Sequence, residues 1–518
     1  LSSDPNLARQ HPADYVKGAE VTIVKALEDA AKTVKGFTPE QVIGVGVDTT
    51  GSTPLPVDEN GRPLAFQKRF AKEPAAMAWL WKDHTGIEEA EEITALAKDM
   101  RPQYLAKCGG AYSSEWFFSK ILHCKRAHRK VFDAAYTWVE CADWIPAMLT
   151  GNEAPDRYVA SVCAAGHKAM YNDAWGGYPD AQFLSKLDPA LAKLRERLKD
   201  KAYAVDTRAG VLSKAWARKT GLPEGIPVAV AAFDAHLGAV GVGIRPGIFA
   251  RIVGTSSCDM AVASMDKPPA DIPGLCGIVP GSILPDAIGL EAGQSAVGDI
   301  FNWFVNYLQP GGAKAGSHEA LTKDAAKLAP GASGLLALDW NNGNRTILVD
   351  QRLTGLLLGQ TLYTTPAEIY RALIEATGFG ALTIINRFEE YGVPIRRVLN
   401  CGGIAEKNPL VMQIYADIMG RTMEISRSAQ TCALGAAIAG AVVAGKKAGG
   451  YSSFSAAQKA MTGLKAKKFK PDPKARRVYK DLYPLYKDLH DAFGTKDWNG
   501  NLGHVMKQLL EIRAKARK

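Results

Sequence analysis

Short uninterrupted apolar runs recur along the chain, and several of them end at polar or glycine-rich stretches. Residues 228–233 form one such run and predict a β-strand; Asp234 follows directly, and small residues that favour a helix come after it. Residues 249–253 predict a second strand, residues 254–257 (Gly-Thr-Ser-Ser) a turn, and the alternating residues 258–263 the returning strand of a hairpin. The pattern therefore places a carboxylate at one strand end and hydroxyl groups in the following turn.

The same periodicities predict the other elements. Helices are expected at residues 12–34, 77–84, 137–150, 299–308, 370–387, 410–419 and 435–445, and strands at residues 42–47 and 396–401. Residues 109–125 are expected to begin with glycines and a serine cap and then to become a helix. The first helix should cover a sheet, and the last, built from small residues, should pack closely on a neighbour. The order of elements thus repeats in outline: strands, a hairpin with hydroxyl groups and glycine, helices, and a turn at a strand end. This repeat predicts two α/β halves facing a cleft.

Length and composition narrow the class of protein. At 518 residues the chain is too long for one core, and its 47% hydrophobic and 22% charged residues are typical of a soluble globular protein. No apolar run approaches the ~18 residues of a membrane span. Eight cysteines are scattered singly, which indicates neither a zinc site nor disulfides and fits the reducing cytoplasm.

The net charge of +10 originates in the carboxy-terminal segment. Residues 446–518 carry 18 basic and 6 acidic residues, an excess of +12 that leaves the remainder of the chain at −2. Tyrosines and leucines are interleaved with these charges, which favours a solvated helical face over a groove that binds nucleic acid. We therefore expect neither a nucleic-acid partner nor a membrane partner.

Asp234 and the turn 254–257 carry the first candidate chemistry. Backbone N–H and side-chain O–H groups of such a turn can bind an anion, and a strand-end carboxylate can take a proton from an attacking hydroxyl. Together they predict phosphoryl transfer; taken separately, Asp234 caps a helix and the turn is only a turn. Residues 48–53 form a second expected pocket wall with Gly51 at its centre, for which capping by Asp48 is the alternative.

Further polar or aromatic residues stand out from their surroundings. Lys168 lies in a small, apolar stretch, where it is either a ligand contact or a surface lysine with a buried stem. Trp81, two residues after Trp79 on a predicted helix, is either core or a stacking surface for a sugar. Glu291 and Gln294 are expected on one side of a helical turn, where both can bond to hydroxyl groups.

A nucleotide-binding turn is predicted where the strand 396–401 meets Gly402 and Gly403. Glycines admit a base or a phosphate close to the backbone. The helix that follows Asn408 favours negative charge at its start.

Taken together, these stretches resemble the FGGY carbohydrate kinases over residues 11–485. The resemblance rests on VGVDTTGSTPLPVDENGRPL, VAAFDAHLGAVG, VGTSSCDM, GLEAGQSAVGDIFNWF, LTGLLLGQTLYTTPAEIYRALIEATGFGA and NCGGIAEKNPLVMQIYADIMG. WLWKDH, GGAYSSEWFFSKILH and AAGHKAMYN are most similar to the L-ribulose kinases of that family. The resemblance implies an α/β fold of two actin-like (ribonuclease H-like) domains with ATP in the cleft between them. The sugar-binding domain is expected at residues 1–244, and the ATP-binding domain, with its basic helical tail, at residues 245–518.

The resemblance also implies roles for individual residues. Asp234 is the expected general base and, through water, a ligand of Mg²⁺. The ketose is expected to contact Gly51, Trp81, Lys168, Asp234 and Glu291, and Gln294 joins this set because of its place beside Glu291. ATP is expected to contact Gly254, Thr255, Ser256, Gly402, Gly403 and Asn408.

The implied reaction is ATP-dependent phosphorylation of a ketopentose at its terminal hydroxyl, L-ribulose first, as in arabinose catabolism. Xylulose or another pentulose or polyol is the alternative substrate, and a non-catalytic sugar or nucleotide sensor is the alternative from another class. One departure favours the sensor. Family members begin with a strand hairpin whose Asp-x-Gly-Thr loop contacts ATP phosphates, and we expect this hairpin to be missing because the chain begins at Leu1. A homodimer is left open.

Overall fold

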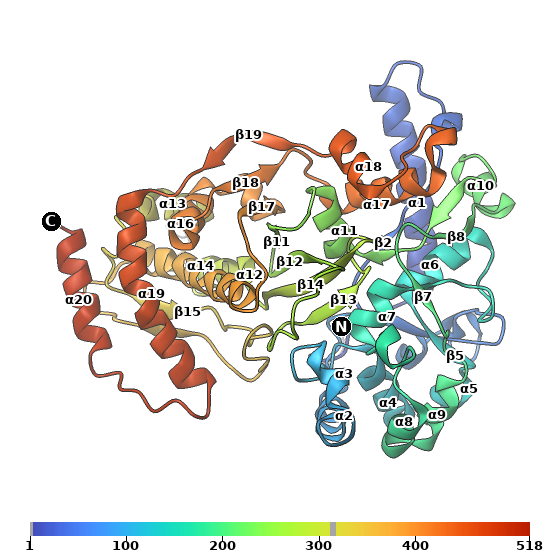
Figure 1. The fold of residues 1–518 in the computed structure, drawn as a ribbon, viewed down its shortest axis with the longest axis horizontal. Coiled ribbons are helices and arrows are strands. Elements are labelled where there is room, and N and C mark those ends of the chain that lie inside the picture. Colours follow the sequence, from blue (N-terminus) through green and yellow to red (C-terminus); the bar gives the residue numbers. More distant parts are fainter. Residues whose placement is uncertain (1–3, 311–316) are drawn as a thin grey trace.

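The computed structural model describes residues 4–310 and 317–518. Two α/β halves lie side by side along the long axis of the molecule, the amino-terminal half on the right of Figure 1 and the carboxy-terminal half on the left. The predicted division into two α/β halves is confirmed.

The amino-terminal half is built from short strands. These are β1 (Arg9–Gln10), β2 (Asp48–Thr49), β3 (Pro54–Val57), β4 (Ala78–Trp79), β5 (Thr137–Glu140), β6 (Ala160–Ser161), β7 (Ala202–Tyr203), β8 (Arg208–Val211), β9 (Pro227–Ala229) and β10 (Ala232–Phe233). In the described part of the chain they join in pairs: β1 with β4, β2 with β10, β3 with β5, β6 with β7, and β8 with β9. The helices are α1 (Pro12–Thr33), α2 (Ile87–Met100), α3 (Pro102–Ala106), α4 (Phe117–Ala127), α5 (Arg129–Ala134), α6 (Cys141–Thr150), α7 (Val162–Lys168), α8 (Ala181–Leu187), α9 (Pro189–Arg195), α10 (Lys214–Thr220) and α11 (Asp234–Gly241).

The apolar run at residues 42–47 is a strand only in part. Val45 forms a single parallel bridge with Val228, and regular pairing begins at β2, which runs parallel to β10. The run lies against the backbone of a carboxy-terminal helix: a Cβ atom on Gly46 would come within 1.8 Å of the Ala436 carbonyl oxygen. The run is half-buried, and the strand predicted at residues 42–47 is wrong in its extent.

Of the helices predicted in this half, one is wrong and another is wrong only at its start, because short apolar runs suit both periodicities. Residues 77–84 contain β4 instead, so that Trp79 is fully buried while Trp81, in the following turn, is 43% exposed. Residues 137–150 divide into β5 and α6, and the strand takes the aromatic and β-branched residues. The helix expected within residues 109–125, after the initial glycines, is α4, and Trp116 stands before it in place of the predicted serine cap.

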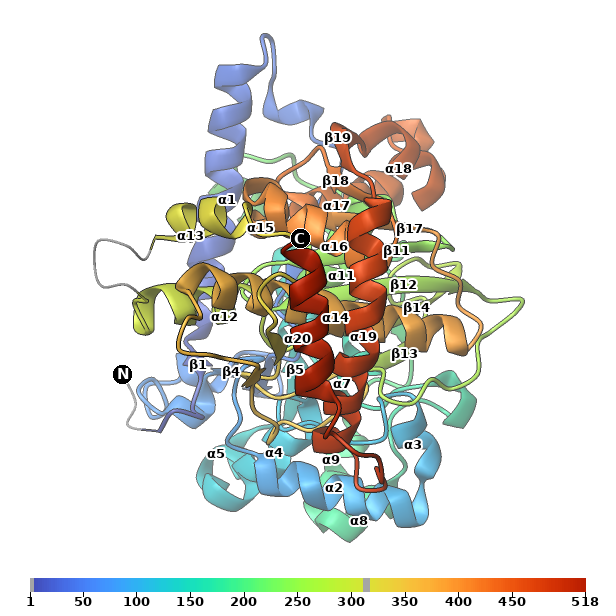
Figure 2. The same cartoon turned by 90° about the vertical axis from the view of Figure 1, so that its left-hand side faces the viewer.

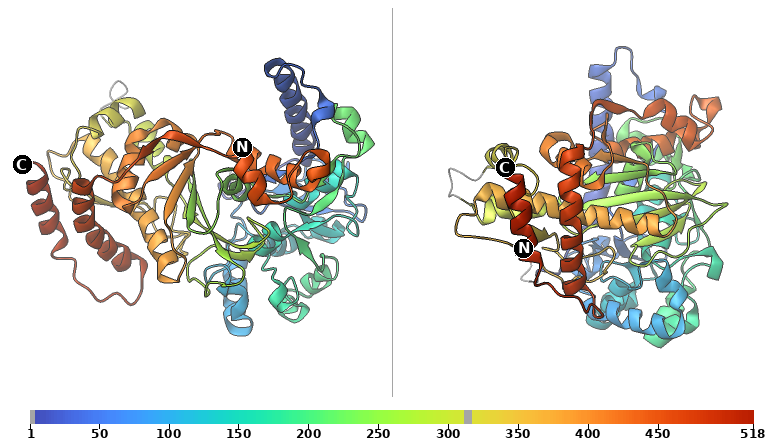
Figure 3. Two further views of the ribbon diagram at one scale, coloured as in Figure 1. Left: turned by 45° about the horizontal axis from the view of Figure 1, so that its top comes forward. Right: turned by 60° about the vertical axis from the view of Figure 1, so that its left-hand side comes forward.

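Helix α1 forms as predicted, but it does not cover a sheet. Val16, Ile23 and Leu27 on its apolar face pack half-buried against the amino-terminal core, and its helical neighbour is α10. The helix projects at the edge of the molecule (Figure 3, left). The predicted sheet-covering role of this helix is therefore wrong.

The carboxy-terminal half is built on a continuous sheet. Its strands are β11 (Ile248–Val253), β12 (Ser257–Ser264), β13 (Gly277–Pro280), β14 (Ala287–Gln294), β15 (Leu336–Leu338), β16 (Leu356–Leu358), β17 (Arg397–Cys401), β18 (Met423–Ser426) and β19 (Leu464–Phe469). Within the described residues, seven of them form one sheet in the order β13-β14-β12-β11-β17-β18-β19, in which β11, β17 and β18 are parallel neighbours. β15 and β16 pair separately.

Helices surround this sheet. They are α12 (Gly298–Asn302), α13 (His318–Ala325), α14 (Pro366–Glu390), α15 (Gly403–Lys407), α16 (Pro409–Met419), α17 (Thr431–Ala444), α18 (Phe454–Met461), α19 (Pro473–Gly494) and α20 (Val505–Ala516). α19 and α20 lie side by side at the outer end of this half (Figures 1 and 2). In the part of the chain that the structure describes, no helix combines the length and the apolar surface needed to span a bilayer.

Most elements predicted for this half are confirmed, among them β11, β12 and β17 and the helices α14, α16 and α17. The exception is residues 289–298, where β14 replaces the predicted helical turn because pairing with β12 and β13 overrides the glycine-rich composition. The basic segment 446–518 supplies β19, α19 and α20. Helix α19 buries Tyr479, Leu482 and Leu485 and leaves its charges on the other face, as predicted.

Each half has its own apolar core, and a third core joins them. This joining core takes side chains from α11, β11, β17 and α17. Helices α11 and α17 are so close that a Cβ atom on Gly435 would lie 1.9 Å from the Leu237 carbonyl oxygen, which confirms the predicted close packing of the small-residue helix. The first residue of α11, Asp234, is therefore held between the halves.

Candidate active site

Asp234 follows β10 directly and begins α11, as the sequence predicts. β10 is parallel to β2, with Ala232 opposite Asp48, so both aspartates lie near one sheet edge. The Asp234 side chain is open to solvent, and its Oδ1 accepts a hydrogen bond from the Ala235 N–H at 2.7 Å. Crowding by protein atoms raises the pKa of Asp234, and the negative charges of Asp48 and Glu291 raise it further. Asp234 is thus accessible and a stronger base than an ordinary aspartate.

Lys168 and Glu291 form a buried ion pair between the two halves. Lys168 ends α7, Glu291 lies in β14, and the Lys168 Nζ donates to both carboxylate oxygens, at 3.0 and 2.9 Å. Burial alone would lower the pKa of Lys168 and raise that of Glu291, but the attraction between their charges reverses both shifts, so both groups stay charged. The alternative of a surface lysine at this position is therefore wrong.

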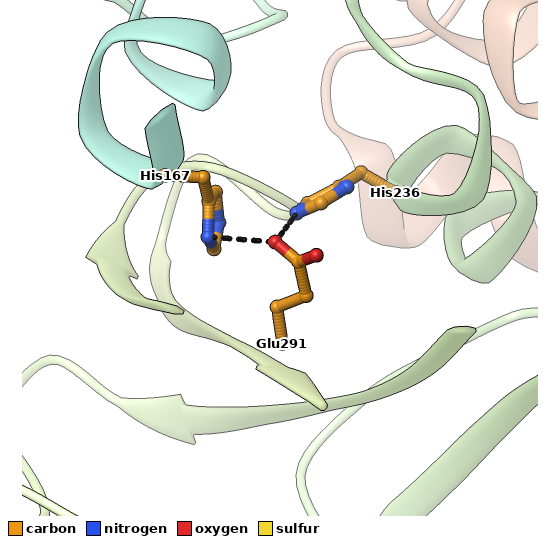
Figure 4. Close-up of side chains that lie close together, drawn as sticks. All are labelled: His167, His236 and Glu291. Carbon is orange, nitrogen blue, oxygen red and sulfur yellow. Dashed lines mark ion pairs between the residues drawn. The ribbon is translucent and has the colours of Figure 1, made fainter. Parts of the chain in front are cut away.

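Two histidines that the sequence analysis missed complete this cluster (Figure 4). His167 Nδ1 lies 3.1 Å and His236 Nε2 3.8 Å from the Glu291 Oε2 atom. Burial lowers the pKa of both imidazoles, so both are neutral at pH 7. A signal for them did exist in the sequence, because His167 precedes Lys168 and His236 follows Asp234 by two positions.

His167, His236 and Glu291 also have the donor types of a transition-metal site, and their ligand atoms lie within 4.8 Å of one another. The ammonium group of Lys168, however, already contacts both Glu291 oxygens. A divalent cation would have to displace that ammonium group. We therefore interpret the cluster as an ion pair flanked by two imidazoles.

Gly51 and Trp81 lie on adjoining segments of the amino-terminal half. A Cβ atom on Gly51 would meet the ring of Phe233, the residue before Asp234, at 3.7 Å, which places the glycine beside the carboxylate. One lysine, Lys120, donates to backbone carbonyls next to Gly51 and next to Trp81, at 2.6 and 2.9 Å. The structure therefore brings both predicted residues to the same region as Asp234.

Gln294 is not part of this cluster. Residues three apart in a strand point to opposite faces, so Gln294 faces away from Glu291. Its side-chain amide accepts from Arg251 at 2.7 Å and donates to Asp339 at 2.6 Å, inside the carboxy-terminal core. The predicted helical turn would have brought Gln294 and Glu291 together, and the strand separates them.

The predicted hairpin turn joins β11 to β12. The Gly254 N–H donates to the Ser256 carbonyl at 2.9 Å, and the Thr255 carbonyl accepts from the N–H groups of Val297 and Asp299 at 2.8 and 3.0 Å. These bonds fix the turn, while the Thr255 side chain is exposed. The turn thus presents a hydroxyl on a fixed backbone, as anion-binding turns do.

The double-glycine turn lies next to this hairpin because β17 and β11 are parallel neighbours. Gly402 has a φ of +96°, and a Cβ atom on it would lie 2.4 Å from the Val253 carbonyl oxygen. Gly403 begins α15 and is exposed. The Asn408 side chain caps α16, since its Oδ1 accepts from the Val411 N–H at 3.2 Å.

The predicted residues thus form two groups, and α11 connects them. On one side of Asp234, Gly51 lies beside Phe233, the charge of Glu291, which is paired with Lys168, acts on Asp234, and Lys120 ties the turn of Trp81 to the Gly51 loop. On the other side, the Thr255 turn adjoins Gly402. Helix α11 lies on the strand that leads into the turn, where a Cβ atom on Gly238 would be 3.3 Å from Ile252 Cγ1. Such an arrangement can deprotonate a bound hydroxyl beside a bound anion.

Both the sequence and the fold of this chain match those of known proteins. Residues 2–241 match the N-terminal domain, and residues 250–444 the C-terminal domain, of the FGGY family of carbohydrate kinases. The ribulokinase of Bacillus licheniformis is 42% identical over 98% of this chain and 90% of its own length. The ribulokinase of Shouchella clausii is 41% identical over 100% of this chain and 90% of its own length.

Solved structures show the same fold. The xylulose kinase from Rhodospirillum rubrum has a TM-score of 0.75 at 22% identity and covers 95% of this chain and 92% of its own. A gluconate kinase from Lactobacillus acidophilus has a TM-score of 0.76 at 17% identity and covers 96% and 92%. The predicted α/β fold of two actin-like domains is confirmed. The chain belongs to the FGGY family of carbohydrate kinases.

Proposed function

We propose that this protein is a ribulokinase, which transfers the γ-phosphoryl group of ATP to the terminal hydroxyl of L-ribulose. The observation that carries the proposal is the charged Lys168–Glu291 pair close to the accessible Asp234, whose pKa is raised by burial and by neighbouring negative charge. Two relatives named ribulokinase are 41% and 42% identical over nearly the whole chain, which favours this pentulose over xylulose.

Asp234 is the proposed general base. It accepts the proton of the terminal hydroxyl while that oxygen attacks the γ-phosphorus in line; the new O–P bond forms, the bond to the bridging oxygen of ATP breaks, and ADP leaves. Lys168 and Glu291 orient the sugar through its other hydroxyls, with Gly51 and Trp81 on the opposite wall. Gln294 is left out of the proposal because its amide is already bonded in the core.

The ATP side of the proposed site uses backbone and hydroxyl groups. Gly254, Thr255 and Ser256 receive the phosphates, and Gly402 and Gly403 leave room for the adenosine next to them. The Asn408 side chain contributes indirectly, by capping the helix that starts there. We propose that residues 1–244 provide most of the sugar site and residues 245–518 the ATP site, with Glu291 as the contribution of the second domain to the sugar.

The residues present also fit Mg²⁺. Asp48 and Asp234 offer carboxylate oxygens, the ligand type that Mg²⁺ prefers. Burial raises the pKa of Asp234 and the charge of Asp48 raises it further, so the two carboxylates are near enough to interact. Asp234, through water, and Asp48 would hold the ion, which when bound neutralises charge on the phosphates.

We propose the cytoplasm as the location of the reaction. ATP is available there, and all eight cysteines are free thiols. A reducing compartment keeps such thiols reduced.

An ATP-coupled assay over a panel of sugars tests the proposal. ADP release is measured with L-ribulose, D-ribulose, both xyluloses, ribitol and glycerol, and we expect the highest kcat/KM with L-ribulose. A higher value with a xylulose would reassign the substrate, and sugar binding without turnover on any member would favour the sensor. Asp234→Asn, purified in parallel, controls for contaminating kinases.

A further inference from the structure

A buried polar network lies beneath the loop that carries Gly51. Lys120 of α4 is fully buried, and its Nζ donates to the carbonyl oxygens of Ser52 at 2.6 Å, Leu80 at 2.9 Å and Trp79 at 3.4 Å. Ser52 belongs to the Gly51 loop, and Trp79 and Leu80 precede Trp81, at least 27 positions later in the chain. The ammonium group therefore links these two segments. The strands next to these segments are short: β2 and β4 have two residues each, and β3, which follows the Gly51 loop and pairs with β5, has four.

Glu140, the last residue of β5, holds the same loop from another direction. Its Oε2 accepts from the Thr53 N–H at 2.7 Å, and its Oε1 accepts from the Ser52 hydroxyl at 3.1 Å. Ser52 has a φ of +33°, a conformation that residues with a side chain rarely adopt and that persists only where the surroundings impose it. Lys120 and Glu140 impose it here, through the carbonyl and the hydroxyl of Ser52.

The charges of Lys120 and Glu140 also stabilise each other. Burial lowers the pKa of Lys120 to about 7 and raises that of Glu140 to about 7, and the attraction between them limits both shifts. An apolar pair of similar volume would stabilise a core at least as well as a buried pair of charges. The network is therefore better explained by the backbone geometry that it imposes than by stability.

We propose that Lys120 and Glu140 are positioning residues for the sugar. They hold the loop of Gly51 and the turn of Trp81 in fixed relative positions, so that one wall of the sugar site exists before the sugar binds. Neither residue touches the reacting atoms. The inference rests on the proposed function, since it concerns the sugar of that reaction.

Glu140→Ala tests the inference most directly, because it removes both acceptors from the loop. We expect KM for L-ribulose to rise at least about tenfold, since small displacements of positioning groups are costly. KM for ATP and kcat at saturating sugar should change less than about threefold, because the ATP turns lie in the other half. Glu140→Gln keeps an acceptor for the Thr53 N–H and should restore most of the wild-type KM.

Glu375→Ala is the matched control. Glu375 is as buried as Glu140 and pairs with Arg371 at 2.8 Å, but it lies in α14 of the carboxy-terminal half. It should lower the unfolding temperature without raising KM for the sugar. A rise in sugar KM equal to that of Glu140→Ala would reduce the effect to general destabilisation and overturn the inference.

Ser52→Ala is the milder probe should Glu140→Ala fail to fold. It deletes the hydroxyl that Glu140 accepts from and leaves the Lys120 contacts in place, and we expect a rise of about threefold in sugar KM alone. An unchanged sugar KM in the folded variants refutes the positioning role and leaves the proposed function intact. Absence of turnover by the wild-type protein on every sugar refutes the proposed function and the inference with it.

Discussion

In the carboxy-terminal half, the Thr255 turn and Gly402 follow β11 and β17, which are parallel neighbours in a seven-stranded sheet of the described residues. In the amino-terminal half, Gly51 follows the two-residue strand β2, and Trp81 follows the two-residue strand β4. The proposed ATP side is thus positioned by the register of strands in one sheet. The proposed sugar side is positioned by buried side chains beneath its loops.

This difference indicates where each side tolerates change. A strand ladder distributes its hydrogen bonds over many residues, so a single side chain matters little to the place where the strand ends. A loop held by Lys120 and Glu140 depends on two side chains. We therefore expect the sugar KM to respond to remote substitutions in the amino-terminal half more than the ATP KM responds to those in the other half.

The largest expected effect comes from the group held between the halves. Asp234→Asn keeps the shape of the side chain and removes the proton acceptor, so kcat should fall at least about 100-fold while both KM values change little. Steady-state kinetics with L-ribulose and ATP measure this. Asp200→Asn, at a fully exposed aspartate of the amino-terminal half, should behave like the wild type. Comparable turnover by Asp234→Asn would show that another group takes the proton.

Breaking the Lys168–Glu291 pair tests whether both halves contribute to the sugar site. Lys168→Met or Glu291→Gln leaves one buried charge without its partner, and either should raise KM for L-ribulose about 10- to 100-fold. The double variant should cost less than the product of the single effects, because the two residues contact each other. A rise in KM for ATP instead would show that the pair belongs to the ATP side of the site and not to the sugar side.

Substitution of glycines measures how rigidly the halves are joined. Gly435→Ala puts a Cβ atom 1.9 Å from the Leu237 carbonyl oxygen. It should lower the free energy of unfolding by at least about 1 kcal/mol. Gly18→Ala in α1, where a Cβ atom meets nothing within 4 Å, should raise it by about 0.5–1 kcal/mol. Urea denaturation of both variants decides; a neutral Gly435→Ala would mean that α11 and α17 separate easily.

The smallest expected effect is a shift in pH dependence. Asp234 must be ionised to accept a proton, so activity is lost as the pH falls through its pKa, which crowding, Asp48 and Glu291 raise above the usual aspartate value. Asp48→Asn removes one of these negative charges and lowers that pKa. The acidic limb of the kcat/KM profile should move to lower pH, whatever the height of the plateau. An acidic limb that stays in place or moves to higher pH would show that the charge of Asp48 does not raise the pKa of Asp234.

The amino-acid sequence by itself determined the local parts of this protein. Asp234 at the start of a helix, the Thr255 turn between two strands and Gly402 after a strand are each specified by a few consecutive residues, and the structure has them where the pattern predicts. The long helices α1 and α14 were equally predictable, because their periodicity extends over many turns.

Only the tertiary structure decided which of these parts meet. Short apolar runs such as residues 77–84 fit both a helix and a strand. Pairing with β1 decided that this run contains the strand β4. The strand β14 placed Glu291 against Lys168, 123 positions earlier, and turned Gln294 into the core. Lys120 reaches the Gly51 loop across 68 positions. Sequence patterns describe neighbours along the chain, whereas the burial of a charge and its partner depend on packing between distant elements.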